Sequence, residues 1–451
     1  MLTNSKNSVP SNTRWHKHTE YHDSGVAWLN SVPSHWDIAP LFTQFRERKT
    51  LNRGNIESNV LSLSYGKIIR RDVADNFGLL PESFETYQIV DEGDLVLRLT
   101  DLQNDQRSLR VGAVHERGII TSAYLGLRNL GQYQSQYAYY LLHAYDLLKV
   151  FYGFGGGVRQ SMRYEDVKRI PLLVPPFDEQ RAIAAFLDRE TATIDTLIAK
   201  KRELIERLQE KRTALISHAV TKGLDPTVAM RDSGVEWLGK IPAHWELSRL
   251  KFAASHIVDC PHSTPEYSQD GIYFVIRTAD IQPGHLSVLD AKKVEYPEYE
   301  KRIFRLKPLP NDIFYSREGE RYGIAALVPA KDPVCLGQRM MHFRSGRDFD
   351  ARYLMWHLNA KGVYAQAEQD VLGATSPHVN VSTIVNFQIA NPPRHEQQAI
   401  ADYIDNESQK MSELQEKMQD AIDRLQEYRT ALISAAVTGK IDVRNYGKGE
   451  A

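Results

Sequence analysis

The residues of this chain that could carry out chemistry form only fragments of known active sites. "FYGFG" from Phe151 fits the F-x-G-x-G pattern of methyltransferase cofactor loops, and "VPPF" from Val174 and "NPPR" from Asn391 resemble the N-P-P-aromatic motif of enzymes that methylate amino groups. "VPPF" lacks the asparagine that would accept the amine hydrogen bonds, and "NPPR" lacks the aromatic ring that would stack on a flipped base. "VRQSMRYEDVKRI" follows the glycine run, where a cofactor loop should open a helix with an acidic residue about 20 positions further on. We therefore predict no methyltransferase site.

Other catalytic and metal-binding patterns are also incomplete. The sequence contains no G-x-x-x-x-G-K-[ST] phosphate loop and no convincing nuclease arrangement of paired carboxylates with a lysine. "DCPH" around Cys260 offers two metal ligands without partners, which is more typical of a turn. His35 and His244 occupy matching P-x-H-W segments, and because no nucleophile or carboxylate recurs beside them we predict packed histidines. We expect no catalytic residue, no metal site and no cofactor in this chain.

Composition indicates a globular protein of more than one domain. The 451 residues are 42% hydrophobic and 25% charged, and no apolar run of membrane-spanning length or apolar N-terminal leader occurs. Cys260 and Cys335 are the only cysteines, which excludes a disulfide framework and favours a reducing cytoplasm. The net charge is −1, from 56 Lys and Arg against 57 Asp and Glu. If DNA is the ligand, positive charge must therefore be concentrated on one face.

An internal repeat is the main signal in the sequence. "DSGVAWLNSVPSHW" from Asp23 returns as "DSGVEWLGKIPAHW" from Asp232, an offset of 209 (232 − 23). "VPPFDEQRAIAAFLD" from Val174 returns as "NPPRHEQQAIADYID" from Asn391, an offset of 217 (391 − 174). "RTALISHAVTKG" and "RTALISAAVTGK" are separated by the same 217 residues. A frame that repeats around two divergent bodies is typical of an internal duplication.

Each proline pair is expected to end a body and to open one long helix, because proline is tolerated at a helix start but not inside a helix. Apolar residues then recur at spacings of three, four and seven over roughly 40 residues, about 60 Å of helix. Gly223 and Gly439 end the two helices. The matching stripes favour an antiparallel coiled coil, and the alternative is two unrelated surface helices, each packed on its own domain. The residues predicted to pack between the helices are Ile194, Ile198, Ile205, Leu208, Leu215, Met411, Met418, Ile422, Leu425 and Leu432.

The bodies alternate apolar and polar residues in segments rich in Val, Ile, Tyr and Thr, which predicts strands, with a short helix late in each body. The expected fold is α+β, with two strand-rich domains, two long helices and internal pseudo-twofold symmetry. "EGDLVLRL" from Glu92 and "PNDIFYSR" from Pro310 are a thin echo between the bodies. The predicted segments are a polar tail (1–22), body 1 (23–175), the first helix (176–223), a linker (224–231), body 2 (232–391), the second helix (392–439) and a C-terminal tail (440–451).

Basic and amide side chains gather in glycine-flanked loops at corresponding places in the two bodies. Lys and Arg can contact phosphates, and Arg, Asn, Gln, Ser and His can contact base edges. In body 1 the candidate DNA-binding residues are Lys67, Arg70, Arg71, Arg98, Gln103, Asn104, Arg107, Arg110, Arg159, Gln160 and Arg163. In body 2 they are His262, Ser263, Arg317, Arg321, Gln338, Arg339, Ser376, His378 and Asn380.

In this order, the doubled "DSGVxWLxxxPxHW", "PPxxEQxAI" and "RTALISxAVT" motifs resemble the DNA-specificity subunit of type I restriction–modification systems, from Asp23 to about Ile441. The resemblance implies that each body is a target-recognition domain reading one half of a split DNA site. It implies that the helices set the spacing between half-sites and that two modification subunits dock on the repeated frame. S-adenosylmethionine, ATP and Mg²⁺ would belong to the modification and restriction subunits, and this chain would have no catalytic role. The rival interpretations are an enzyme fused to its own DNA reader and a coiled-coil scaffold with two protein-binding modules.

Overall fold

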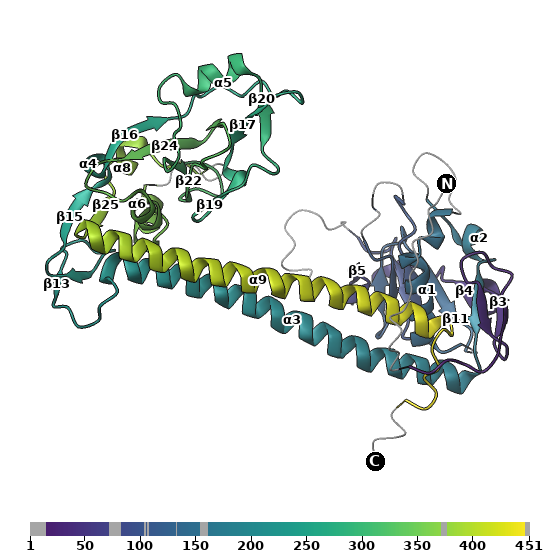
Figure 1. The fold of residues 1–451 in the computed structure, drawn as a ribbon. Helices are drawn as coiled ribbons and strands as arrows, with labels where there is room; N and C mark the ends of the chain where they lie inside the picture. Colours follow the sequence, from purple (N-terminus) through teal and green to yellow (C-terminus); the bar gives the residue numbers. More distant parts are fainter. Residues whose placement is uncertain are drawn as a thin grey trace. The chain divides into compact units, whose positions relative to one another are not determined.

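The structure is a computed structural model of the chain, and it describes residues 15–71, 83–102, 105, 108–131, 133–153, 161–370 and 377–446. The chain divides into two compact units (Figure 1): unit 1 comprises residues 1–200 and 420–451, and unit 2 comprises residues 201–419. Each unit therefore contains one body and half of each long helix. Within the described ranges, no helix combines the length and the apolar character needed to span a membrane.

Unit 1 is built around a four-stranded antiparallel sheet in the order β4-β11-β8-β9. Its central strand β8, Leu95–Leu97, is buried along its whole length, because side chains cover both faces of the sheet. Smaller pairs β1-β2, β3-β12, β5-β6 and β7-β10 surround this sheet. The remaining elements are β1 (Tyr21–Asp23), β2 (Ser31–Pro33), β3 (Asp37–Pro40), β4 (Phe45–Glu47), β5 (Leu61–Ser64), β6 (Lys67–Arg70), β7 (Gln88–Val90), β9 (Val111–Ala113), β10 (Gly118–Ile120), β11 (Leu125–Asn129), α1 (Ser135–Leu147), α2 (Tyr164–Val167) and β12 (Pro171–Val174).

Unit 2 has a four-stranded antiparallel sheet in the order β16-β24-β21-β22 and a three-stranded sheet, β20-β17-β23. The pairs β13-β14, β15-β25 and β18-β19 complete it. Its elements are β13 (Met230–Asp232), β14 (Lys240–Pro242), β15 (Glu246–Arg249), α4 (Leu250–Ala253), β16 (Ala254–Asp259), β17 (Tyr273–Ile276), β18 (Ile281–Gln282), β19 (His285–Leu286), β20 (Lys292–Val294), α5 (Tyr296–Ile303), β21 (Ile313–Ser316), β22 (Ala325–Leu327), β23 (Val334–Leu336), β24 (Met340–Ser345), α6 (Ala351–Leu358), α7 (Lys361–Glu368), α8 (Val381–Ile384) and β25 (Gln388–Asn391).

The two bodies share one sheet topology although their sequences differ. In each four-stranded sheet the strand that comes first along the chain lies at one edge, next to the strand that comes last, and the two middle strands follow. The strands of the sequence echo, β8 and β21, occupy the same place in their sheets. The predicted α+β architecture with internal duplication is therefore confirmed.

The two long helices are α3 (Phe177–Lys222) and α9 (Arg394–Val437). In unit 1 the first half of α3 lies beside the last half of α9, and Arg429 is 2.9 Å from the carboxylate of Asp195. In unit 2 the last half of α3 lies beside the first half of α9, and Val220 and Ile404 belong to one buried cluster. The pairing is thus antiparallel in each unit (Figure 1). The ten residues predicted to pack between the helices are all buried or half-buried.

The strands β8 and β21 begin with the same turn, which a buried aspartate closes. The carboxylate of Asp94 accepts a hydrogen bond from the backbone N–H of Asp91 at 2.9 Å, and the carboxylate of Asp312 accepts one from Leu309 at 2.8 Å. Such side-chain bonds to the backbone stabilise tight turns. Only the charged partners of the two aspartates differ.

The balance between burial and these partners shifts the pKa values of the two aspartates in opposite directions. Burial alone would raise the pKa of Asp312, but hydrogen bonds from Arg344 and His342 outweigh burial and lower this pKa to about 2. Burial raises the pKa of Asp94, and the hydrogen bonds from Asp91 and Arg48 offset it only in part.

The two aspartates should consequently give opposite responses to acid. Ionised Asp312 stabilises unit 2 by about 2 kcal/mol above its unfolded-state pKa, and this contribution is lost as the pH falls through the folded-state pKa. Asp94, whose pKa is raised in the folded state, stabilises unit 1 below its unfolded-state pKa and loses that contribution as the pH rises. As the pH falls from about 5 to 2, we expect the difference in free energy of unfolding between wild type and Asp312→Asn to shrink. Over the same range, the free energy of unfolding of wild type should rise relative to that of Asp94→Asn. Hydrogen exchange of the amides in each unit measures both gaps, and two slopes of the same sign would contradict the assignment.

Candidate nucleic-acid interface

The glutamates of the two closing motifs contact the histidines of the two opening motifs. In unit 1, Nε2 of His35 is 2.8 Å from a carboxylate oxygen of Glu179, and in unit 2, Nε2 of His244 is 2.7 Å from one of Glu396. The histidine side chains are 40% and 44% exposed. The prediction of packed histidines without a recurring carboxylate is therefore wrong. The carboxylates do recur, but they lie 144 and 152 residues further along the chain.

The glutamines of the closing motifs hold α1 and α6, the helix that follows the last strand of each four-stranded sheet. The Oε1 atom of Gln180 accepts a hydrogen bond from the backbone N–H of Gln134, which caps α1, at 2.9 Å. Gln397 accepts the same bond from Asp350, which caps α6, at 2.7 Å. Each glutamine also donates to the carbonyl of the first proline of its pair at 2.9 Å. A repeated glutamine therefore joins the variable body to the constant helix.

In each body, one tyrosine contacts the end of the long helix that belongs to the other repeat. The hydroxyl of Tyr137 on α1 lies 3.2 Å from the carbonyl oxygen of Val437 near the end of α9. The hydroxyl of Tyr353 on α6 lies 3.3 Å from the carbonyl oxygen of Val220 near the end of α3. One turn further along these body helices, Tyr140 donates to Asp188 at 2.8 Å and Trp356 donates to Asp405 at 2.7 Å. This set of contacts occurs once in each unit, and we call each copy the socket. The helix residues of the sockets are Glu179, Gln180, Asp188 and Val437 in unit 1, and Glu396, Gln397, Asp405 and Val220 in unit 2.

The first group of candidate DNA-binding residues of body 1 lies on the hairpin β5-β6. Lys67 is exposed at the start of β6, and Tyr65 at the hairpin tip is 90% exposed with φ of 47°. Arg70 is exposed, and its Nε atom lies 2.7 and 2.9 Å from the two carboxylate oxygens of Glu116. Arg71 is half-buried. This hairpin therefore offers cations and an aromatic ring to a ligand.

A second group of basic residues of body 1 lies where β8 ends. Arg98 is half-buried, and its guanidinium is 3.4 Å from Asp105. The backbone N–H of Met162 donates to the carbonyl of Leu99 at 2.9 Å and so places the exposed Arg163 beside this strand end. The structure thus brings Arg98 and Arg163 together from segments more than 60 residues apart in the sequence.

Arg110 does not belong to the interface, although its type and loop predicted it. Its side chain is fully buried. The guanidinium donates to the carbonyls of Arg98 and Thr100 at 3.0 and 2.9 Å, to the carbonyl of Asp105, and to the hydroxyl of Tyr152 at 3.1 Å. Arg110 therefore stabilises the loop that presents Arg98, because its terminal nitrogens donate to carbonyls of that loop and its Nε donates to Tyr152.

In unit 2 the predicted loops converge around the end of β21. The backbone N–H of Arg317 donates to the carbonyl of Arg339 at 2.9 Å, and the backbone N–H of Val379 donates to the carbonyl of Arg317 at 3.2 Å. Glu318 and His378 form an isolated β-bridge. Segments from three parts of body 2 therefore lie side by side, and two of their arginines, Arg321 and Arg339, are exposed.

The prediction that Arg317 binds DNA directly also needs correction, because Arg317 is only 8% exposed. Its guanidinium lies 3.6 Å from Asp259 and beside Glu318. The other oxygen of Asp259 is 3.3 Å from the exposed ring of His262. Arg317 therefore positions neighbouring loops, whereas His262 is exposed to solvent.

A buried arginine that the sequence did not single out supports the same surface. Arg302 on α5 is 4% exposed and donates to Glu298 at 2.8 Å and to the carbonyl of the exposed Ser263 at 2.8 Å. The only signal for Arg302 in the sequence is its spacing of four residues from Glu298.

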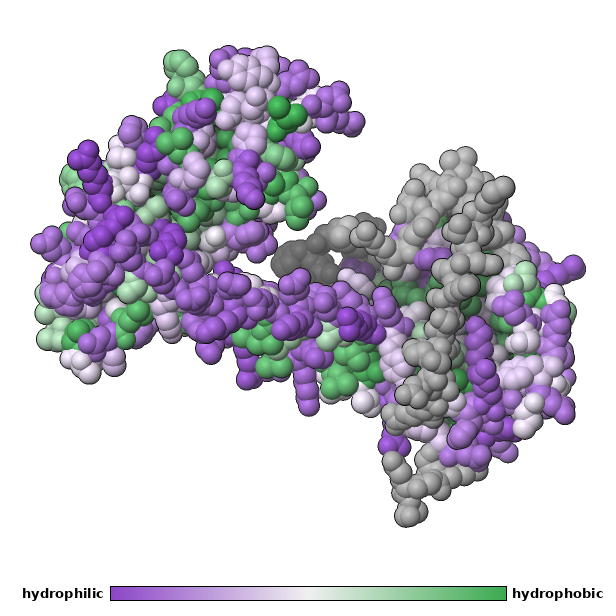
Figure 2. Space-filling model, in the orientation of Figure 1, coloured by the Kyte–Doolittle hydropathy of each residue, from purple (hydrophilic) through white to green (hydrophobic). Residues whose placement is uncertain are grey.

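The remaining candidates divide into two sets. Gln338, His378 and Asn380 are half-buried, and the side chain of Asn380 donates to Asp370 at 3.0 Å. Hydrophilic residues cover much of the visible face of unit 2, with apolar residues scattered between them (Figure 2). The candidates outside the described residues are Gln103, Asn104, Arg107, Arg159, Gln160 and Ser376.

Two units share one topology and each has its own copy of the socket, but they carry different polar loops, which defines a protein with two different polar surfaces on a repeated frame. Two curated specificity subunits of type I restriction enzymes from Methanocaldococcus jannaschii are similar to it. The chain is 24% identical to the MjaVIII subunit over 79% of this chain and 81% of that protein. It is 23% identical to the putative MjaX subunit over 70% of each.

A chain in one solved structure has the same fold. That structure is described as the structural basis of complex assembly and conformational transition of the type I restriction–modification system. Its TM-score is 0.65 at 15% identity, over 90% of this chain and 98% of that chain. Residues 125–207 and 255–424 match the model of the type I restriction–modification DNA specificity domain, and together they make up more than half of the sequence. The chain therefore belongs to the type I restriction–modification DNA-specificity family. It is a specificity subunit, and catalysis lies in other subunits.

Proposed function

We propose that each body reads one half of an asymmetric, two-part DNA target. The observation that carries this proposal is that equivalent loops of the two bodies hold different side chains on the same sheet. The sequence between β8 and β9 is "RLTDLQNDQRSLR" from Arg98, whereas the sequence between β21 and β22 is the shorter "REGERYGI" from Arg317. A symmetric dimer would require a palindrome. One chain with two unlike readers on a repeated frame fits a target whose halves differ.

The helices α3 and α9 would set the spacing of the half-sites and complete the docking surface for two modification subunits. Half-sites read from one side of DNA lie about one helical turn apart, roughly 34–36 Å. The repeated "RTALIS" helix ends offer the same surface twice. Apolar side chains on the helices are also exposed: Leu197 is 43% exposed in unit 1, and Leu414 is 43% exposed in unit 2. The partner subunits would bring S-adenosylmethionine, ATP and Mg²⁺, and the assembly would work in the cytoplasm.

Exchange of residues 23–175 for the body of a relative with a different target tests the proposal. We expect one half of the methylated motif to change and the other half, together with the gap, to persist, because the socket holds either body in the same way. Sequencing of methylated bases in cells that carry the chain with its modification subunit measures this outcome. The reciprocal exchange of residues 232–391 is the matched control and should change the opposite half. A change in both halves, or in neither, is incompatible with modular recognition.

An enzyme that reads and methylates DNA without partners is the main alternative. The purified chain, incubated with S-adenosylmethionine and DNA, should transfer no methyl groups until the modification subunit is added. Methyl transfer by the chain alone would refute the proposed division of labour.

A further inference from the structure

A cluster of three metal-ligand side chains lies at the base of unit 1. One ligand atom from each of His18, His35 and Glu179 lies within 4.8 Å of the others. They come from the segment before β1, from the opening motif and from the first turn of α3. Within the described ranges this is the one group of three or more His, Cys, Asp or Glu residues gathered in this way.

His18 is the residue that ordinary packing does not explain. It is 6% exposed, and neither ring nitrogen has a hydrogen-bond partner. Its Nε2 atom points at the cluster, 3.7 Å from a carboxylate oxygen of Glu179. Buried polar groups are nearly always satisfied, so an imidazole that no protein group satisfies and that is directed at a histidine–glutamate pair is suited to bind a ligand there.

The far side of the His18 ring has the surroundings of a metal-binding histidine. The Nδ1 atom lies 3.9 Å from a carboxylate oxygen of Asp442, whose two oxygens also accept hydrogen bonds from Arg444 at 2.9 and 2.7 Å. Histidines that bind a metal through one ring nitrogen commonly direct the other at a carboxylate, which fixes the tautomer and the ring orientation.

Unit 2 provides an internal comparison in which no histidine occupies the position of His18. The pair His244–Glu396 has the same short contact as His35–Glu179, and Asp225 is the counterpart of Asp442 (442 − 217). The position equivalent to His18 (18 + 209) is Thr227.

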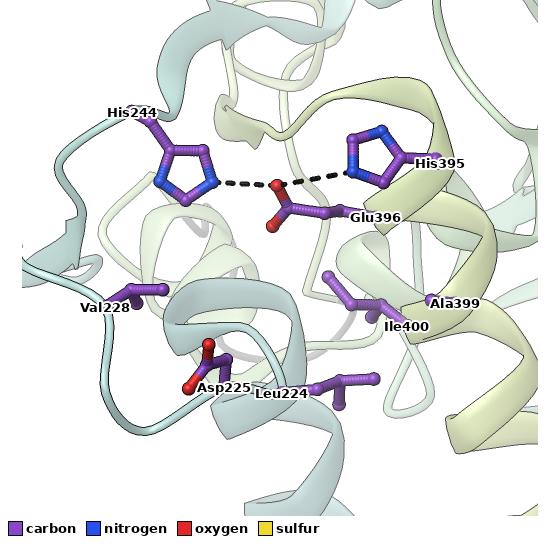
Figure 3. Close-up of a pocket in the computed structure, with 8 residues that line it drawn as sticks. All are labelled: Leu224, Asp225, Val228, His244, His395, Glu396, Ala399 and Ile400. Carbon is purple, nitrogen blue, oxygen red and sulfur yellow. Dashed lines mark hydrogen bonds and ion pairs between the residues drawn. The ribbon is translucent and has the colours of Figure 1, made fainter.

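A cavity of about 290 Å³ lies beside the unit 2 pair and is lined by Leu224, Asp225, Val228, His244, His395, Glu396, Ala399 and Ile400. Figure 3 shows His244 and His395 on either side of the Glu396 carboxylate, with His395 at 4.0 Å. His395 is 81% exposed and its counterpart in unit 1 is Asp178 (395 − 217), so the histidine–glutamate pair alone belongs to the frame and a buried third imidazole is specific to unit 1.

We propose that His18, His35 and Glu179 bind a divalent transition-metal ion, for which zinc is the best match. Two imidazoles and one carboxylate form a common zinc ligand set, with metal–ligand distances near 2.0–2.2 Å and water as the fourth ligand. The 40% exposed side chain of His35 leaves a path to solvent for that water. To bind the ion, His35 must be neutral with its proton on Nδ1, so that Nε2 and the Glu179 carboxylate are both free to act as ligands. The ion would fasten the segment before β1 to the start of α3 and so stabilise the base of unit 1.

Metal content and cobalt spectroscopy of the full-length, untagged chain test this site. After chelator treatment and dialysis against Zn²⁺ or Co²⁺, we expect one ion per chain. Cobalt should give the visible bands of nitrogen and oxygen coordination without thiolate charge transfer, because Cys260 and Cys335 are buried elsewhere. We also expect Zn²⁺ to raise the melting temperature of the wild-type chain.

The matched variants are His35→Gln and His244→Gln, because each removes one exposed histidine–glutamate pair from the same place in the frame. His35→Gln should weaken Co²⁺ binding by more than about 100-fold, since losses of 10- to 100-fold already follow the loss of outer-shell partners. His244→Gln should bind as wild type does. His18→Gln should also abolish binding, and circular dichroism checks its fold. Wild type without stoichiometric metal, equal loss in both matched variants, or a folded His18→Gln that binds normally would each overturn the proposal.

Discussion

Arg110→Ala is expected to lower the free energy of unfolding of unit 1 by about 3–5 kcal/mol. The variant removes a fully buried guanidinium and leaves the carbonyls of Arg98, Thr100 and Asp105 without their donor inside the protein. It also removes the positive charge beside the buried carboxylate of Asp146, whose pKa burial raises. Water cannot replace these interactions without opening the loop, so the loss should far exceed that of a surface arginine.

Hydrogen exchange by mass spectrometry locates this effect, because a chain with two compact units does not unfold as one two-state body. Exchange should accelerate in β8, β9 and α1 of unit 1 and stay unchanged in unit 2. Arg70→Ala is the matched control: its side chain is 72% exposed, so it should leave the stability of both units unchanged.

The same pair of variants separates a structural role of Arg110 from DNA readout. A base-reading arginine contributes about 1–3 kcal/mol of discrimination at one base position. If Arg110→Ala left unit 1 stable and relaxed one base of the methylated motif, the assignment of Arg110 to the loop interior would be wrong. Arg70→Ala, by contrast, should weaken binding to all sequences alike if Arg70 contacts phosphate.

The sequence predicted the repeated frame well, because short local sequence features determine where its helices begin and end. Proline pairs, glycines with positive φ and apolar residues at spacings of three and four fix the ends and the buried stripes of α3 and α9. The duplication also pairs β8 with β21, because both copies of their turn keep the aspartate that closes it.

The contacts of the site could not be predicted in the same way, because they join residues far apart in the chain. Glu179 and Gln180 were visible as a repeated motif, but their partners, His35 and Gln134, lie in other segments. His18 lies in no repeated motif, and the expectation of no metal site rested on the two cysteines and on the unpartnered ligands of "DCPH" around Cys260.

Residue type also failed to separate arginines that face solvent from those that face the interior. Arg98 and Arg110 begin and end one loop, and Arg317 and Arg321 belong to another. In each loop one arginine is accessible and the other is buried. Which of the two turns inward depends on the carbonyls and carboxylates that the rest of the unit places there.

Gly439→Ala is expected to destabilise unit 1 by several kcal/mol, more than the same change at any other glycine of the frame. Gly439 has φ of 70°, and an added Cβ would lie 2.4 Å from Cδ of Pro33 and 3.1 Å from the ring of Trp36. The left-handed backbone alone costs alanine about 1–2 kcal/mol, and overpacking against a rigid ring adds about 1–3 kcal/mol. Because this contact closes the end of α9 onto the opening motif, the strain should loosen the base of unit 1.

Three other glycines separate the backbone cost from the packing cost. Gly25 and Gly234 have φ of 68° and 71° with nothing within 4 Å of an added Cβ, so alanine there should show the backbone cost alone. Gly223 is intermediate, with Trp245 at 3.2 Å. Hydrogen exchange in the unit that holds each glycine should rank the losses as Gly439, then Gly223, then the two open positions. A loss at Gly439 no larger than at Gly25 would mean that the end of α9 does not press on Pro33 and Trp36, and that the two repeats are closed by the socket alone.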